Sequence, residues 1–221
     1  MNDRQYLQSL ISEGEHQQQD FKYKVQDACK LARSVSAFAN TDGGRLLIGV
    51  RDDGHLSGVR SEEEIYMMHQ AAYKYCQPAA SIKFDTYTVA ASPGSATTRG
   101  LRTIVVATVP PSARKPVFAL DEAGRQRAYI RIADENILAS PVHLIIWREE
   151  SAAGGVLMPY DGAHQKLMAA LGAQPQQTLS QVVRRAAMPR PKVITMLARL
   201  IRYQLATCHY DGHTFRFSQN A

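Results

Sequence analysis

Cysteine is scarce in this chain, and long apolar runs are missing. The three cysteines, Cys29, Cys76 and Cys208, lie far apart and outside any CxxC spacing, so neither a disulfide framework nor a zinc site is indicated. The longest apolar runs, at 104–109 and 144–147, are far too short to span a bilayer. The first residues lack the basic and apolar regions of a secretory signal. The sequence therefore predicts a soluble, cytoplasmic protein with no membrane partner.

Acidic residues are almost absent from the last third of the sequence. Residues 1–159 contain 18 basic and 18 acidic side chains, whereas residues 160–221 contain 8 and 2. The net charge of +6 is thus concentrated in the C-terminal third. A basic segment on an otherwise neutral protein can bind phosphate groups, although a solvated helix face would have the same composition.

Composition also divides the chain. Its 221 residues with 45% hydrophobic content are enough for one or two domains. The stretch "SAAGGVLMPYDG" at 151–162 is rich in small residues and interrupts two periodic segments. The sequence therefore predicts a first domain at 1–150, a linker at 151–160 and a second domain at 161–221.

Helical and strand-like segments are mixed in the first domain. Helical periodicity occurs at 3–12, 25–39 and 61–76, and short β-branched or aromatic runs occur at 45–50, 81–90, 101–109, 116–120 and 128–132. The order of these segments shows no regular βαβ alternation. We therefore expect an α+β fold with a mixed sheet.

The second domain is predicted to contain three helices followed by a hairpin. Helical patterns cover 163–172, 178–188 and 189–205, and Asp211-Gly212 joins two short strands. This order is the winged helix-turn-helix arrangement, in which the third helix enters the DNA major groove. The expected DNA contacts come from six side chains, Arg184, Arg185, Arg190, Lys192, Thr195 and Arg199. Because two DNA half-sites need two recognition helices, we also expect a homodimer.

A glycine-rich stretch at 37–59, "AFANTDGGRLLIGVRDDGHLSGV", stands out in the first domain. Backbone geometry explains most of it, because glycine and asparagine tolerate positive φ where a helix stops and a strand begins. Asp52 and Asp53 follow the strand and are suited to a turn. Taken alone, this stretch predicts a helix, a buried strand and a turn that returns the chain.

Several segments together resemble the Schlafen AlbA-type domain. They are "EHQQQDFK" at 15–22, "SAFANTDGGRLLIGVRDDGHLSGV" at 36–59, "RKP" at 114–116 and "AYIRIADENILAS" at 128–140, and the resemblance covers roughly 8–140. It implies nucleic-acid binding, and bacterial members with a C-terminal winged helix are described as transcriptional regulators. Our first functional expectation is therefore a regulator that binds duplex DNA, without a cofactor and without enzymatic activity.

The same resemblance implies an alternative, a metal-dependent endoribonuclease that acts on structured RNA. The acidic residues of such relatives correspond to Glu15, Asp20 and Asp52, which would bind Mg²⁺ or Mn²⁺ and act as the catalytic site. Lys22 would contact phosphate, unless Asp20 and Lys22 are ordinary edge-strand charges. This sequence departs from the pattern because Asp20 replaces a glutamate and Arg51 stands where an acid is frequent. We therefore expect a binding scaffold that does not cleave RNA.

Overall fold

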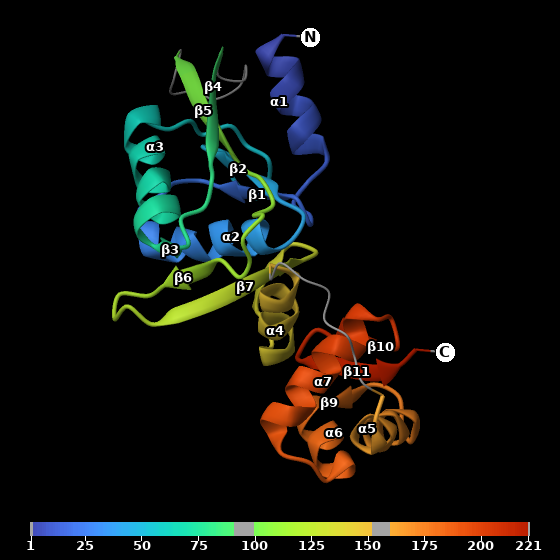
Figure 1. Ribbon diagram of the computed structural model, residues 1–221. Helices are drawn as coiled ribbons and strands as arrows, with labels where there is room; N and C mark the ends of the chain where they lie inside the picture. Colours follow the sequence, from blue (N-terminus) through green and yellow to red (C-terminus); the bar gives the residue numbers. More distant parts are fainter. Residues whose placement is uncertain (1, 91–99, 152–159, 221) are drawn as a thin grey trace. The chain divides into compact units, whose positions relative to one another are not determined.

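The chain forms two compact units, Met1–Leu138 and Ala139–Ala221. The computed structural model describes residues 2–90, 100–151 and 160–220 (Figure 1). No helix among these residues is long and apolar enough to cross a membrane. Each unit has a hydrophobic core of its own.

A mixed four-stranded sheet forms the centre of the N-terminal unit. Its strand order is β1 (Gln19–Lys22), β2 (Gly44–Ile48), β5 (Leu101–Val109) and β4 (Lys83–Ala90). β1 and β2 are parallel, whereas the other neighbours are antiparallel. Leu46 and Ile48 pack on one face with helix α2 (Ala28–Asn40), and Leu47 packs on the other with α1 (Asp3–Ser12). The expected α+β class with a mixed sheet is therefore confirmed.

A second, antiparallel sheet packs on the far side of α2. Its strand order is β3 (Cys76–Gln77), β6 (Phe118–Leu120), β7 (Gln126–Ile132) and β8 (Glu135–Leu138). The buried amide of Asn40 donates to the carbonyl oxygens of Val117, at 2.8 Å, and Tyr129, at 3.0 Å. These bonds tie the last residue of α2 to the second sheet, so α2 lies between the two sheets (Figure 1).

The segment expected to form one helix at 61–76 has a break near its end. Helix α3 covers Ser61–His69 and continues as a π-helical turn, η1, at Gln70–Lys74 before β3 begins. Three glutamates occupy the first turn of α3, where the helix dipole favours negative charge. One of them, Glu64, is buried.

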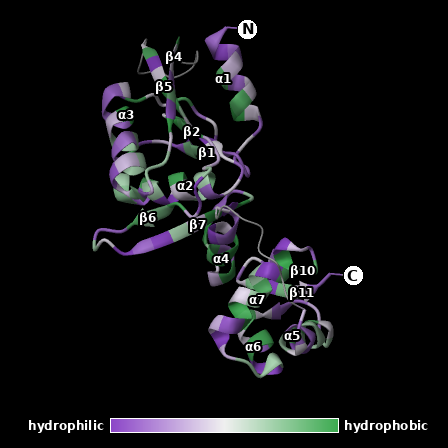
Figure 2. Ribbon diagram, viewed as in Figure 1, coloured by the Kyte–Doolittle hydropathy of each residue, from purple (hydrophilic) through white to green (hydrophobic). Residues whose placement is uncertain are grey.

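In its described residues, the C-terminal unit combines four helices with a small sheet. Its elements are α4 (Pro141–Glu150), α5 (Gly162–Gly172), β9 (Gln177–Thr178), α6 (Leu179–Ala186), α7 (Arg190–Arg202), β10 (Ala206–Tyr210) and β11 (Phe215–Gln219). The sheet is antiparallel with the order β10-β11-β9. The carboxylate of Asp211 accepts hydrogen bonds from the backbone N–H groups of His213, at 2.9 Å, and Thr214, at 2.8 Å, in the turn between β10 and β11. Figure 2 shows polar and apolar residues along α7, as an amphipathic helix requires.

Helix α4 lies with the C-terminal unit, which differs from the expected boundary after residue 150. Val142 is fully buried in the same core as Leu167 and Leu197, and Ile145 and Ile146 pack against that core. The apolar stripe of α4 thus covers α7, so the division of the chain falls after Leu138. Most of the expected linker at 151–160 lies outside the described residues.

Candidate nucleic-acid interface

A buried carboxylate on β1 is surrounded by cations. Asp20 is only 4% exposed, and its Oδ2 lies 2.7 Å from the Lys22 ammonium without hydrogen-bond geometry. Its Oδ1 lies 3.6 Å from the guanidinium of Arg131. Lys22 Nζ also donates to the Phe21 carbonyl at 2.8 Å. The ammonium expected to contact phosphate is therefore engaged within its own strand.

Arg131 connects β7 to β1 and α2. It is 1% exposed and donates through Nη2 to the Gln19 carbonyl at 3.0 Å and through Nη1 to Asn136 Oδ1 at 3.0 Å. Its guanidinium lies over the Phe38 ring, 5.1 Å from the ring centroid. Our sequence reasoning missed this residue. A charged residue inside the apolar run "AYIRI" was the available indication, because a buried arginine needs partners.

Glu15 lies beside Asp20. Its Oε1 accepts a hydrogen bond from the backbone N–H of Phe21 at 2.8 Å. Partial burial raises the pKa of Glu15, and the neighbouring Asp20 carboxyl raises it further, whereas the Phe21 N–H and the Lys22 charge act in the opposite direction. Two of the three carboxylates proposed for a metal site are thus brought together.

Asp52 does not join this pair. It lies in an exposed turn that Gly54 N–H closes onto the Arg51 carbonyl at 2.8 Å. A Cβ at Gly54 would lie 2.8 Å from Ile11, so the turn packs against α1. Among the described residues, no three His, Cys, Asp or Glu side chains are placed to hold one metal ion. The expected convergence of Glu15, Asp20 and Asp52 is therefore not present, and these residues do not fit a three-carboxylate metal site.

The side chains of the C-terminal unit that are expected to contact DNA differ in their exposure and in the hydrogen bonds that they already form. Arg184, Arg190 and Lys192 are exposed, and Arg190 makes only a 3.3 Å hydrogen bond to Ser180 Oγ. Arg185 donates to Gln174 and Gln177 at 2.6 and 2.9 Å. Thr195 Oγ1 donates to the Pro191 carbonyl at 3.1 Å within α7. Arg184 at the end of α6, and Arg190 and Lys192 at the start of α7, are therefore exposed cations without an acidic partner among the described residues.

Arg199 is held by an acid that sequence reasoning missed. Glu149 of α4 accepts a hydrogen bond from Arg199 Nε through Oε1 and one from Arg202 Nη1 through Oε2, both at 3.0 Å. All three side chains are less than one third exposed. The available indication was the acidic end of an apolar helix just before the basic third of the chain, but its pairing depends on tertiary packing.

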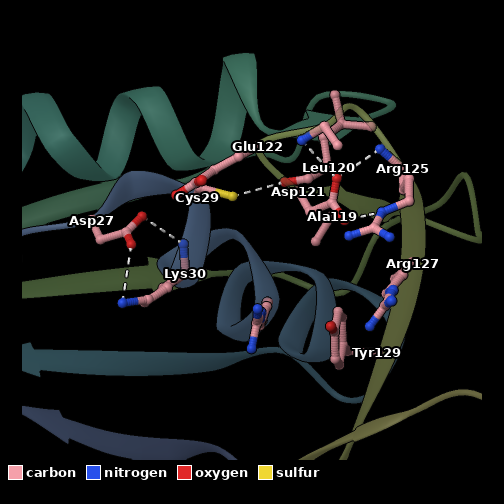
Figure 3. Close-up of a pocket in the computed structure, with 12 residues that line it drawn as sticks. Asp27, Cys29, Lys30, Ala119, Leu120, Asp121, Glu122, Arg125, Arg127 and Tyr129 are labelled. Carbon is pink, nitrogen blue, oxygen red and sulfur yellow. Dashed lines mark hydrogen bonds and ion pairs between the residues drawn. The ribbon is translucent and has the colours of Figure 1, made fainter.

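A pocket of about 330 Å³ lies between the start of α2 and β6–β7 (Figure 3). Asp27 pairs with Lys30 at 3.4 Å, and Asp121 pairs with Arg125 at 2.7 Å. Figure 3 shows Arg127 and Tyr129 on β7, on the same side of the pocket as Arg125. Much of the pocket's charge is therefore neutralised locally.

Comparisons with known proteins place the N-terminal unit in a family. No curated protein matches the chain. Among solved structures, the chain is similar to the DIP2311 protein from Corynebacterium diphtheriae, with 18% sequence identity and a TM-score of 0.44. The match covers 90% of this chain and 34% of that one, so this chain spans about a third of its length. A family model described as "Schlafen, AlbA_2" matches residues 15–140. Because this match covers more than half of the sequence, the chain belongs to the Schlafen AlbA_2 family.

Proposed function

We propose that the chain is a DNA-binding transcriptional regulator whose C-terminal unit is a winged helix and acts in a homodimer. The order α5, β9, α6, α7, β10, β11 with the sheet order β10-β11-β9 supports this assignment. In such a domain α7 is the helix that enters the major groove, and the turn between β10 and β11 is the wing. Membership of the Schlafen AlbA_2 family supports nucleic-acid interaction in general.

One observation carries the proposal: the cations at the start of α7 are exposed. Arg190 and Lys192 occupy its first turn, and neither has an acidic partner among the described residues. The opposite side of the helix is fixed in the core by Val193, Leu197 and Leu200. A rigid helix with a free basic end can contact two or more phosphates without first breaking ion pairs.

Replacing Arg190 and Lys192 together with alanine should weaken binding to duplex DNA by roughly 10- to 100-fold at low salt. The slope of log K against log salt should also fall by about 2, because two phosphate contacts are lost. Fluorescence anisotropy with a labelled duplex, at several salt concentrations, measures both quantities.

Lys166→Ala is the matched control, because Lys166 is an exposed cation on α5. It should leave the affinity within about twofold if α7 is the reading element. Equal losses in the control and the double variant would contradict the assignment of α7. A parallel titration with transfer RNA tests whether structured RNA is the preferred partner.

Glu149 should limit this binding, because it forms ion pairs with two arginines on α7. Glu149→Gln should raise DNA affinity by roughly three- to tenfold at low salt and steepen the salt dependence, as Arg199 and Arg202 become available to phosphates. Glu150→Gln is the control, since Glu150 is exposed at the end of the same helix. Equal affinities for the two variants would show that Arg199 and Arg202 do not face the DNA.

A further inference from the structure

Two arginines in the pocket between α2 and β6–β7 are left without an acidic partner. Arg33 on α2 and Arg127 on β7 both line this pocket and are both exposed, and neither forms an ion pair among the described residues. Exposed guanidinium groups at a concave surface can bind an anion without first breaking an ion pair. The pocket is therefore a candidate anion site, separate from the DNA contacts proposed for α7.

The two aspartates of the pocket do not neutralise these arginines, because each is held in its own turn. Asp27 accepts a hydrogen bond from the Lys30 backbone N–H at 3.0 Å and pairs with the Lys30 ammonium. Asp121 accepts hydrogen bonds from the Arg125 backbone N–H at 2.9 Å and from Arg125 Nε at 2.7 Å. The backbone N–H groups of Lys30 and Arg125 lower the pKa of Asp27 and of Asp121, respectively. Both aspartates are therefore charged and already paired near neutral pH.

The register of β7 places Arg127 on the side of the strand that faces α2. Side chains two residues apart share a face of a strand, and Tyr129 packs into the core that contains Leu31 of α2. Ala119, which pairs with Arg127 across β6 and β7, is buried in the same core. Figure 3 shows Arg127 and Tyr129 extending from the same side of β7. Arg33 and Arg127 thus border one pocket from two different elements.

Tyr129 adds a neutral hydrogen-bond donor to the pocket. The residue is 9% exposed and lines the pocket. Its hydroxyl forms no hydrogen bond with the described residues, and it does not belong to the unpartnered polar atoms that are fully covered. The hydroxyl is therefore accessible from the pocket, where it can donate to an oxygen atom of a ligand.

The remaining charges restrict the ligand. Glu122 is exposed, lines the pocket and forms no ion pair among the described residues, so it opposes an anion. The two unpaired arginines outnumber it. A phosphate monoester carries a charge of about −1.5 to −2 at pH 7, and its oxygens match the fork of the guanidinium group. A phosphodiester or a carboxylate carries less charge and gains less from two arginines.

We propose that this pocket binds a phosphate monoester through Arg33, Arg127 and the Tyr129 hydroxyl. Its volume of about 330 Å³ is at the lower end of the range for small-molecule sites. A sugar phosphate or the 5′-phosphate end of a nucleic-acid strand would present the same group. This site goes beyond the function proposed for α7, because it lies in the other unit.

Calorimetric titration of the full chain with ribose 5-phosphate tests the proposal. Ribose 5-phosphate should bind saturably, and ribose should give no saturable heat, because the phosphate supplies the contacts. Dimethyl phosphate, which carries a single charge, should bind at least fivefold more weakly than ribose 5-phosphate. Equal affinity for ribose 5-phosphate and dimethyl phosphate, or no saturable binding of ribose 5-phosphate, would overturn the proposal.

Three substitutions locate the site. Arg33→Gln and Arg127→Gln should each lower the affinity for ribose 5-phosphate by roughly fivefold or more, since each removes charge-assisted hydrogen bonds. Tyr129→Phe keeps the packed ring and should lower the affinity by roughly threefold. Arg114→Gln is the matched control, because Arg114 is exposed in the same unit and does not line the pocket. Unchanged affinity in both arginine variants, or equal losses in the control, would also refute the site.

A comparison of two oligonucleotides distinguishes the two sources of the phosphate. An adenosine octamer with a 5′-phosphate is compared with the same octamer with a 5′-hydroxyl. Both are titrated into Arg190→Ala with Lys192→Ala, so that a contribution of α7, or its absence, does not affect the result. Tighter binding of the phosphorylated octamer identifies a strand end. Equal affinity of the two octamers, together with binding of ribose 5-phosphate, identifies a free sugar phosphate.

Discussion

Replacing Arg131 with methionine should lower the free energy of unfolding of the N-terminal unit by about 3–5 kcal/mol. The substitution leaves Asp20, which is 4% exposed, without its buried cationic neighbour. It also removes the hydrogen bond to the Gln19 carbonyl and the bond to Asn136, which lie in β1 and β8. Methionine fills much of the same volume, so the expected cost comes from uncompensated polar groups rather than from a cavity.

Hydrogen exchange of the β7 amides measures this loss within the full chain. The only tryptophan, Trp147, belongs to the C-terminal unit, so its fluorescence serves as an internal reference that should not change. Arg127→Met is the matched control, because Arg127 lies on the same strand but is exposed and should cost less than about 1 kcal/mol. Adding Asp20→Asn to Arg131→Met should recover part of the loss, since the buried negative charge is then removed. A loss below about 1 kcal/mol in Arg131→Met would refute the structural role of this arginine.

Acidification should destabilise the C-terminal unit through His143. Burial lowers the pKa of His143 from 6.5 to about 4. Nδ1 lies 2.8 Å from Ser140 Oγ, and the ring packs on Phe215 with the centroids 4.7 Å apart. Between pH 6.5 and 4 the unfolded chain binds a proton that the folded unit excludes. Stability is therefore complete above pH 6.5 and falls by about 3 kcal/mol as the pH drops to 4.

Denaturant unfolding followed by Trp147 fluorescence at pH 7 and at pH 4.5 tests this expectation. Trp147 is a direct reporter, because its ring centroid lies 5.9 Å from that of His143. His143→Phe keeps the aromatic packing and should abolish most of the loss between the two pH values. His209→Gln changes an exposed histidine and should leave it intact. A loss of the same size in all three proteins would assign the pH dependence to other groups.

Local pattern predicted much of the fold, because helices, strands and turns depend on neighbouring residues. The hairpin around Asp211-Gly212 and the helices α1 and α7 lie where periodicity and turn residues indicated. Local pattern could not predict which of the two units α4 packs with, since an apolar stripe does not specify the surface that it covers.

The candidate sites depended more strongly on contacts between distant residues. Arg131 contacts β1 more than 110 residues away in sequence, and Glu149 pairs with arginines about 50 residues later. The resemblance grouped Glu15 with Asp20, and the two lie close together because Glu15 shortly precedes the strand β1 that contains Asp20. It failed for Asp52, whose position follows from the packing of its turn on α1. The exposure of Arg190 and Lys192 agrees with the expectation from the sequence. Both residues lie at the start of the helix, before the apolar stripe that is buried.

The junction after Leu138 also determines where this chain could be recombined with another. The family match ends at residue 140, and α4 then packs its apolar side into the C-terminal core. A crossover after residue 150 would carry α4 away with the first unit and expose apolar surface on both products. A crossover between 138 and 141 leaves both cores intact. The exchangeable cassettes are therefore the family domain alone, and α4 together with everything described after it.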